Sequence, residues 1–197
     1  MIIRAEKALE EALLSLCKEK HLDIITIKDI LARSGAARQT FYNHFKDKYD
    51  LINYIYRSEA DRLLDIFNRG LDWHDTLLEI YTHFYNYKYF YIQAIKMDGQ
   101  NCFFDYMQQN TISFYTNTVI RKYGKDIITD ELLFIIKHTS YGDVNICREW
   151  MLKDMDLPIE DMADYLIACI PTKLSEYLLA GDSAKAVSHH TGRRLSR

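Results

Sequence analysis

Apolar side chains recur at helical spacing along most of the chain. The strongest patterns repeat at intervals of three and four residues over 2–20, 48–69, 73–95 and 128–153. Weaker helical patterns follow the same rule over 101–109, 111–123 and 159–180. Proline, the strongest helix breaker, is absent before Pro158, and Pro171 is expected to kink or restart the last helical stretch. The pattern therefore predicts an all-α protein.

A more compact pattern, two short helices joined by a tight turn, lies between residues 26 and 48. The first helix, at about 27–33, has one apolar face, made by Ile27, Ile30 and Leu31. Thr26 stands at the N-cap position, and Gly35 stands where the backbone must reverse, often with a positive φ. A second helix at about 37–43 turns Phe41 and Phe45 inward. The spacing predicts a helix-turn-helix, which lays its second helix in the DNA major groove.

Long polar side chains occupy the other face of that second helix. Arg38 and Gln39 lie at its start, where side chains meet base edges in such motifs. Arginine matches O6 and N7 of guanine, and glutamine matches N6 and N7 of adenine. A solvated polar face is the alternative interpretation. A helix this short has little reason to form except to present these groups, so we favour DNA contact.

Composition and charge agree with a folded protein. The 197 residues are 48% hydrophobic and 27% charged, with a net charge of −3. Basic residues nevertheless outnumber acidic ones between Thr26 and Lys48. The four cysteines are far apart and form no CxxC motif, which favours free thiols in a reducing compartment. No apolar run is long enough for a membrane span and the N-terminus does not resemble a signal peptide, so we expect a cytoplasmic protein.

The segment from Gly35 to Lys48, Gly-Ala-Ala-Arg-Gln-Thr-Phe-Tyr-Asn-His-Phe-Lys-Asp-Lys, resembles the signature of TetR/AcrR-type bacterial transcriptional regulators. The match continues to Leu51, and the opening Thr26-Ile-x-x-Ile also fits, so that the resemblance covers about residues 5–56. The run from Arg38 to Asn43 is also similar to a subgroup near the activators of dihydroxyacetone kinase operons. Those activators work with a protein partner.

This resemblance implies a division of the chain and a set of DNA contacts. A three-helix DNA-binding domain would occupy 1–47, a helical effector-binding and dimerisation domain 48–182, and a disordered basic tail 183–197. Arg38 and Gln39 would contact bases, while Lys28 and Thr26 would anchor the backbone. The other expected contacts, to phosphate, thymine methyls or the groove, are Ala37, Thr40, Tyr42, Asn43, His44 and Lys48. His44 could instead be a structural donor, and Asn43 could face solvent.

The second domain is rich in aromatic residues, which line many small-molecule sites but also fill ordinary cores. As a set, the candidates for an effector pocket are His83, Tyr87, Phe104, Phe114, His138 and Tyr141. The family resemblance further implies a homodimer formed through the helices at about 128–153 and 159–180. Gly142, within the first of these, could permit close helix crossing.

Enzymatic motifs are missing from the sequence. It contains no HExxH, GxSxG, P-loop or GxGxxG pattern, and no two histidines stand at i, i+4, so we expect no metal site, no cofactor and no enzyme. The function predicted is that of a dimeric repressor released from a pseudo-palindromic operator by a small molecule. Two alternatives remain open: an activator controlled by a protein partner, and a small-molecule enzyme or carrier.

Overall fold

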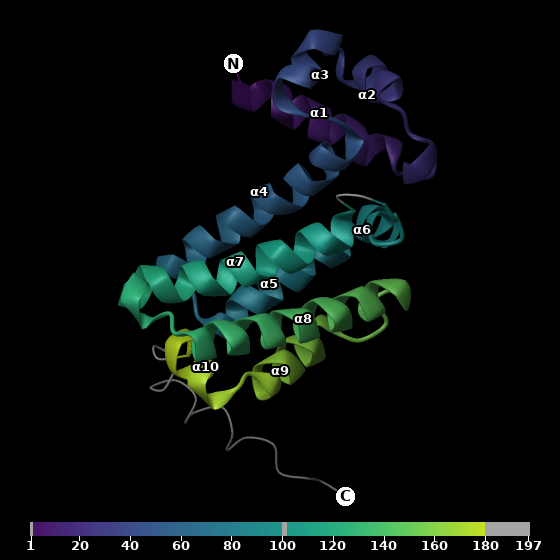
Figure 1. The fold of residues 1–197 in the computed structure, drawn as a ribbon. Coiled ribbons are helices and arrows are strands. Elements are labelled where there is room, and N and C mark those ends of the chain that lie inside the picture. The colour runs from purple at the N-terminus through teal and green to yellow at the C-terminus, as the bar shows by residue number, and fades with distance from the viewer. Residues whose placement is uncertain (1, 100–101, 180–197) are drawn as a thin grey trace, which may run out of the picture.

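The computed structural model describes residues 2–99 and 102–179, and within these ranges all regular structure is helical. The first unit contains α1 (Ile2–Leu16), the short 3₁₀ helix η1 (Leu22–Ile24), α2 (Ile27–Ser34) and α3 (Arg38–His44). Helix α4 (Lys48–Asn68) then runs diagonally away from this unit into the rest of the molecule (Figure 1). The expected basic tail, 183–197, lies outside the described residues.

The second unit is a layered bundle. It consists of α5 (Trp73–Asn86), α6 (Lys88–Ala94), α7 (Phe103–Tyr123), η2 (Lys125–Ile127), α8 (Asp130–Leu152), α9 (Ile159–Cys169) and α10 (Thr172–Leu178). Helix α7 packs against α4 on one side and α8 on the other, while α9 packs against α5. Helices α8 to α10 therefore lie at the end of the molecule remote from α1–α3 (Figure 1).

Local signals in the sequence explain the helix-turn-helix. The hydroxyl of Thr26 accepts the backbone N–H of Asp29 at 3.2 Å, and the Asp29 carboxylate accepts the backbone N–H of Thr26 at 2.8 Å. This reciprocal capping box starts α2, and Gly35 ends it in the left-handed conformation with φ 68°. Asp47 caps α4 by accepting the N–H of Asp50. The predicted helices near 27–33, 37–43 and 48–69 are confirmed.

The apolar core is continuous from the first unit into the second. Beneath the helix-turn-helix, the fully buried side chains include Leu9, Leu13, Ile30, Phe41 and Leu51. The N-terminal half of α4 belongs to this part of the core, and its C-terminal half packs against α5 and α7. Because α4 serves both units, a domain boundary at residue 48 remains a prediction.

A second connection joins the two units at η1. The backbone N–H of Leu22 donates to Oε1 of Gln93, on α6, at 2.6 Å. The Gln93 amide in turn donates to the carbonyl of Tyr89 at 2.6 Å, which fixes its orientation. The first unit is therefore held by α4 and, independently, by a hydrogen bond to α6.

Three helix predictions needed correction. The helix expected over 2–20 ends at Leu16, and the two helices expected over 101–109 and 111–123 are one helix, α7. The helix expected over 73–95 breaks at Tyr87 into α5 and α6. Pro171 restarts the chain between α9 and α10, one of the two outcomes expected for it, and these two helices form the helical stretch expected over 159–180.

Candidate DNA-binding surface and ligand cavity

Helix α3 presents a polar face over an apolar seam. Phe41 is completely buried and Phe45 nearly so, and together they seat the helix on the core. On the opposite side Arg38, Gln39 and Asn43 are exposed, and Tyr42 has 44% of its surface exposed. The seam and the exposed face therefore lie where the sequence predicted them.

Neighbouring side chains order this polar face before any DNA arrives. The guanidinium of Arg38 lies over the Tyr42 ring, 5.5 Å from its centre. The amide of Gln39 donates to Oδ1 of Asn43, one turn later, at 2.8 Å. Asn43 thus orients Gln39, and both remain accessible. Such pairing lowers the entropy cost of docking these side chains against a duplex.

The other expected contacts have mixed surroundings. Lys28 and Ala37 are exposed and Thr40 is partly buried, whereas the Thr26 hydroxyl is engaged in the capping box. His44 is mostly covered, with Nδ1 3.3 Å from a carboxylate oxygen of Glu6 on α1. The His44 ring therefore joins α3 to α1, and the partner in this structural role is a side-chain carboxylate, not a backbone group.

Lys48 has a different environment from the one expected for a phosphate ligand. Its ammonium donates to the carbonyls of Leu22 at 2.8 Å, Asp23 at 2.9 Å and Ile25 at 2.8 Å. These three bonds use all three of its protons. Partial burial lowers the pKa of Lys48 below its usual value. This geometry disagrees with the phosphate contact implied by the family resemblance, because the side chain satisfies backbone carbonyls at the end of η1.

A cavity of about 90 Å³ lies among α4, α5, α7, α8 and α9 of the second unit. Of the six expected effector residues, His83 and Phe114 line it. The other four do not. His138 and Tyr141 are exposed on α8, and the Phe104 ring is covered by the Arg148 guanidinium. Tyr87 lies outside the cavity, with its ring tilted by 42° against that of His83. Helix periodicity could not show which face of α8 turns inward.

Two carboxylates lie at the cavity, in different electrostatic surroundings. Asp143 accepts a hydrogen bond from the Tyr115 hydroxyl at 2.6 Å, and burial raises its pKa to about 6. Burial also acts to raise the pKa of Glu59, but Arg62, whose Nε donates to Oε2 of Glu59 at 2.9 Å, together with His83 brings that pKa below its usual value. Burial lowers the pKa of His83, whose Nε2 lies 2.8 Å from the Tyr91 hydroxyl.

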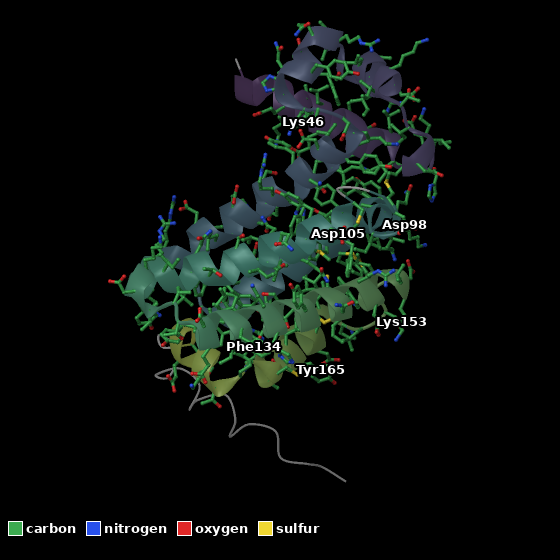
Figure 2. All side chains as sticks on the ribbon, in the orientation of Figure 1. Lys46, Asp98, Asp105, Phe134, Lys153 and Tyr165 are labelled. Atoms are coloured by element: carbon green, nitrogen blue, oxygen red, sulfur yellow. The ribbon has the colours of Figure 1, made fainter. Side chains whose placement is uncertain are left out.

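Large apolar side chains are exposed on the outer side of α8 and α9. Phe134 has 71% of its surface exposed and Tyr165 has 58%, and Figure 2 places both at the end of the molecule remote from Lys46. We call this surface the α8–α9 face and define it by Phe134, Tyr141, Ile146, Leu152 and Tyr165. Phe134 and Tyr141 are seven residues apart and so lie on one side of α8.

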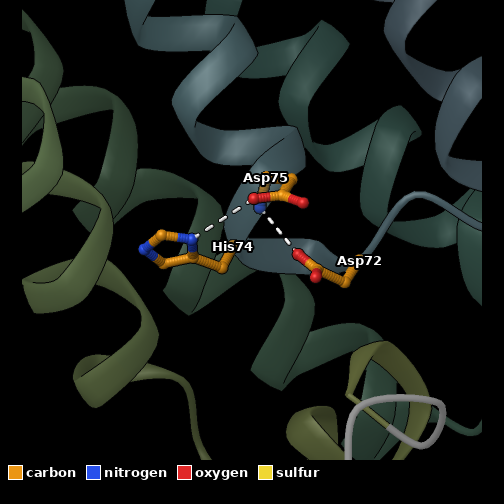
Figure 3. A group of neighbouring side chains, drawn as sticks. All are labelled: Asp72, His74 and Asp75. Carbon is orange, nitrogen blue, oxygen red and sulfur yellow. Dashed lines mark hydrogen bonds and ion pairs between the residues drawn. The ribbon is translucent and has the colours of Figure 1, made fainter. Parts of the chain in front are cut away.

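Within residues 2–99 and 102–179, one group of possible metal ligands stands at the start of α5: Asp72, His74 and Asp75 (Figure 3). Asp72 is already the helix cap and accepts the N–H of Asp75 at 2.7 Å. Nδ1 of His74 lies 3.7 Å from the Asp75 carboxylate, and Nε2 lies 3.4 Å from that of Asp164. Capping and surface ion pairs account for this arrangement.

Comparison with known families agrees with both units. The model of the bacterial regulatory proteins of the tetR family matches residues 11–55, which include the helix-turn-helix. The model of a TetR-type transcriptional regulator C-terminal region matches residues 72–171, half of the chain. The chain belongs to the TetR family. It is a DNA-binding transcriptional regulator.

Solved structures show the same fold for this TetR-family regulator. The dihydroxyacetone kinase operon activator DhaS is 19% identical, with a TM-score of 0.64 over 88% of this chain and 98% of its own. A TetR transcriptional regulator from Streptococcus agalactiae is also 19% identical, with a TM-score of 0.59 over 86% and 94%. A protein from Syntrophomonas wolfei, described as a TetR-family regulator, is 17% identical, with a TM-score of 0.54 over 92% and 96%.

No curated protein is similar enough in sequence to be matched to this regulator. In the part of the chain that the structure describes, no helix is both long and apolar enough to cross a membrane.

Sequence reasoning missed the polar residues that distinguish the cavity of this regulator. Asp143, Glu59 and Trp73 all line it. A carboxylate on an otherwise apolar helix face could have singled out Asp143, since Val144, Cys147 and Trp150 are buried on the same helix. The aromatic pattern alone directed attention to exposed rings instead.

Proposed function

We propose that this regulator binds a pseudo-palindromic operator as a homodimer and is a repressor released by a small-molecule effector. The observation that carries the proposal is α3, whose ordered polar face stands over the buried Phe41 and Phe45. Dimerisation would bring two copies of α3 to successive major grooves, about 34–36 Å apart. DNA contact by Arg38, Gln39, Tyr42 and Asn43, with Lys28, Ala37 and Thr40 nearby, belongs to this proposal.

The α8–α9 face supports the dimer. Phe134 and Tyr165 are exposed large apolar side chains, and a second copy packed against them would remove this apolar surface from water. Two copies packed through this face would form a contact of four helices, α8 and α9 from each subunit. We therefore assign the α8–α9 face to the second subunit.

The test begins with selection of bound sequences from random DNA, followed by affinity measurement on the selected site. Arg38→Ala should weaken binding by about 1–3 kcal/mol and relax the choice of base at one position of each half-site. Arg121→Ala, at an exposed site on α7 in the other unit, is the matched control and should bind as the parent does. Equal affinity and equal base preference in Arg38→Ala and the parent would refute the assignment of α3.

A second candidate function is activation of transcription together with a protein partner. The likeness to DhaS favours it, because that protein is named as an operon activator. At 19% identity this likeness concerns the fold, so the sign of regulation needs a direct test. A reporter gene behind the selected operator should fall in expression when the regulator is supplied if it represses, and rise if it activates.

A further inference from the structure

The cavity contains a carboxylate that no basic side chain neutralises. Asp143 has one hydrogen-bond partner, the Tyr115 hydroxyl, and no lysine, arginine or histidine lies within ion-pair distance of it in the described ranges. Glu59, the other carboxylate at the cavity, is paired with Arg62. Burial of a charge without an opposite charge beside it lowers stability, and carboxyls in such surroundings cluster at binding and catalytic sites.

The remaining lining complements a cation. It includes six aromatic rings, and it contains no lysine or arginine; the rings are those of Tyr56, Trp73, Tyr81, Phe84, Phe114 and Tyr115. Ring faces attract ammonium groups that have lost their water. The one histidine of the lining, His83, has its Nδ1 3.7 Å from the Glu59 carboxylate, and burial favours its neutral form by lowering its pKa.

One polar group of the lining is also unsatisfied. Trp73 is only 1% exposed, and its indole Nε1 has no hydrogen-bond partner. Buried indole N–H groups normally find an acceptor, so a ligand atom could supply it here. Asp143 therefore offers a carboxylate to a cation, and the Trp73 indole offers an N–H donor to a ligand lone pair, within the same small cavity.

We propose that the cavity binds a small organic cation, with its ammonium group against Asp143 and its apolar body among the aromatic rings. The volume of about 90 Å³ restricts the ligand to a compact amine. An anion would have to be buried beside Asp143, and a neutral molecule would leave that carboxylate unpaired. The role of this cation as the effector rests on the proposed function of the regulator, whereas its binding to the cavity does not.

Occupancy of the cavity can reach the DNA-binding unit through α4. Tyr56, Glu59, Ala60 and Leu63 all line the cavity and all belong to α4, which begins at Lys48 beside the helix-turn-helix. A ligand that displaces this stretch tilts the helix on which α1–α3 are carried. Such a ligand shifts the population toward the state it binds better.

The experiment compares three probes that share an isobutyl group: isobutylammonium, isobutanol and isovalerate. Binding to the full chain is measured by calorimetry and by the shift in melting temperature at pH 7.5, without DNA. Isobutylammonium should bind at least tenfold more tightly than isobutanol, and isovalerate should not bind. Comparable affinities for the ammonium and the alcohol, or no binding of any probe at millimolar concentration, would overturn the proposal.

Variants then assign the effect to one carboxylate. Asp143→Asn should lose tenfold or more in affinity for isobutylammonium, with isobutanol little changed. Asp126→Asn, which removes an exposed carboxylate on η2, is the matched control and should bind as the parent does. Retention of the ammonium preference in Asp143→Asn would exclude Asp143 as the counter-ion.

A measurement on the unmodified protein avoids any dependence on the fold of the variant. At pH 6, binding of isobutylammonium should release about half a proton per site, because the cation favours the ionised form of a carboxyl that is half protonated there. Calorimetry in buffers with different ionisation enthalpies gives this number. The absence of proton release would contradict an ion pair with Asp143.

Failure of this inference is distinguishable from failure of the proposed function. If Arg38→Ala binds operator DNA like the parent while isobutylammonium still binds the cavity, only the proposed DNA contacts are wrong. If the parent binds its operator but none of the probes, only the ligand assignment is wrong.

Discussion

Replacement of Asp143 by asparagine should stabilise the ligand-free protein at neutral pH. The substitution keeps the shape of the side chain and an oxygen that accepts the Tyr115 hydroxyl, but it removes a negative charge that burial disfavours. Most substitutions in a protein interior destabilise it, so a gain in stability would be diagnostic.

The magnitude follows from the pKa of Asp143. Burial raises it from 3.8 to about 6, a difference that corresponds to about 3 kcal/mol at high pH. Because the folded state binds the proton more tightly than the unfolded state, stability is greatest below about pH 4 and is lost as the pH rises through about 6. Roughly 1.4 kcal/mol of this loss falls between pH 5 and pH 8.

The asparagine amide recovers only part of that free energy. Its N–H₂ group brings two donors into a space where the carboxylate had acceptors, at a cost of about 1–2 kcal/mol if one donor stays unpaired. The net gain at pH 8 should therefore be about 1–2 kcal/mol. This cost is the same at every pH. The change with pH in the stability difference between parent and variant therefore reports on the Asp143 carboxyl alone.

Urea unfolding followed by tryptophan fluorescence measures it directly. The two tryptophans, Trp73 and Trp150, are both buried in the second unit, so the signal reports on the part of the protein that contains Asp143. The free energy of unfolding should be compared for the parent, Asp143→Asn and Asp126→Asn at pH 5 and pH 8. The advantage of Asp143→Asn should grow by about 1.4 kcal/mol between these values, and Asp126→Asn should follow the parent. Parallel curves for the parent and Asp143→Asn would refute the reasoning, because they would show that the carboxyl is solvated.

Three further predictions concern the rest of the molecule. Lys48→Met should lower the free energy of unfolding by about 1–3 kcal/mol, because it leaves the carbonyls of Leu22 and Ile25 without their donor. The dependence of DNA affinity on salt concentration should not change. If the slope of the logarithm of affinity against the logarithm of salt concentration fell by about one, Lys48 would be a phosphate contact. Phe134→Glu should convert the proposed dimer to a monomer in light scattering at micromolar concentration, and an unchanged dimer mass would exclude the α8–α9 face as the interface. Gly35→Ala should lower the free energy of unfolding in urea by about 1–2 kcal/mol, because φ is 68° at this position; the space around it is open, so no steric clash adds to this loss. Gly142→Ala, within α8, should not lower the free energy of unfolding.

The helix-turn-helix could be predicted closely because its signals are local. Thr26 and Asp29 satisfy each other three residues apart, Gly35 reverses the chain, and Phe41 and Phe45 stand one turn apart. Each of these relations depends on neighbouring residues and not on the rest of the fold. Helix ends that carry such signals were placed within a residue or two.

The second unit was less predictable because its signals are not local. Helix α7 packs against α4, α8 and α10, so apolar residues occur on several of its faces and the periodicity weakens, which suggested two helices instead of one. The break at Tyr87 between α5 and α6 has neither glycine nor proline to indicate it. Which side chains of α8 face the cavity depends on how α8 packs on α7, and this packing decides that Asp143 lines the cavity while Tyr141 faces outward.

The same helix, α4, connects the two halves of the proposed mechanism. Leu51 and Ile52, in its first turns, are buried in the core beneath the helix-turn-helix, and Leu63, three turns later, lines the cavity. A packed helix transmits displacement with little compression, since the interiors on both sides are close-packed. The hydrogen bond from Leu22 to Gln93 resists such a displacement, because it fixes η1 to α6 independently of α4. Any ligand that tilts α4 must therefore either break this bond or carry α6 with it. The coupling between cavity and operator is also reciprocal: a cation that weakens DNA binding by some factor must itself bind more weakly to the DNA-bound protein by that factor.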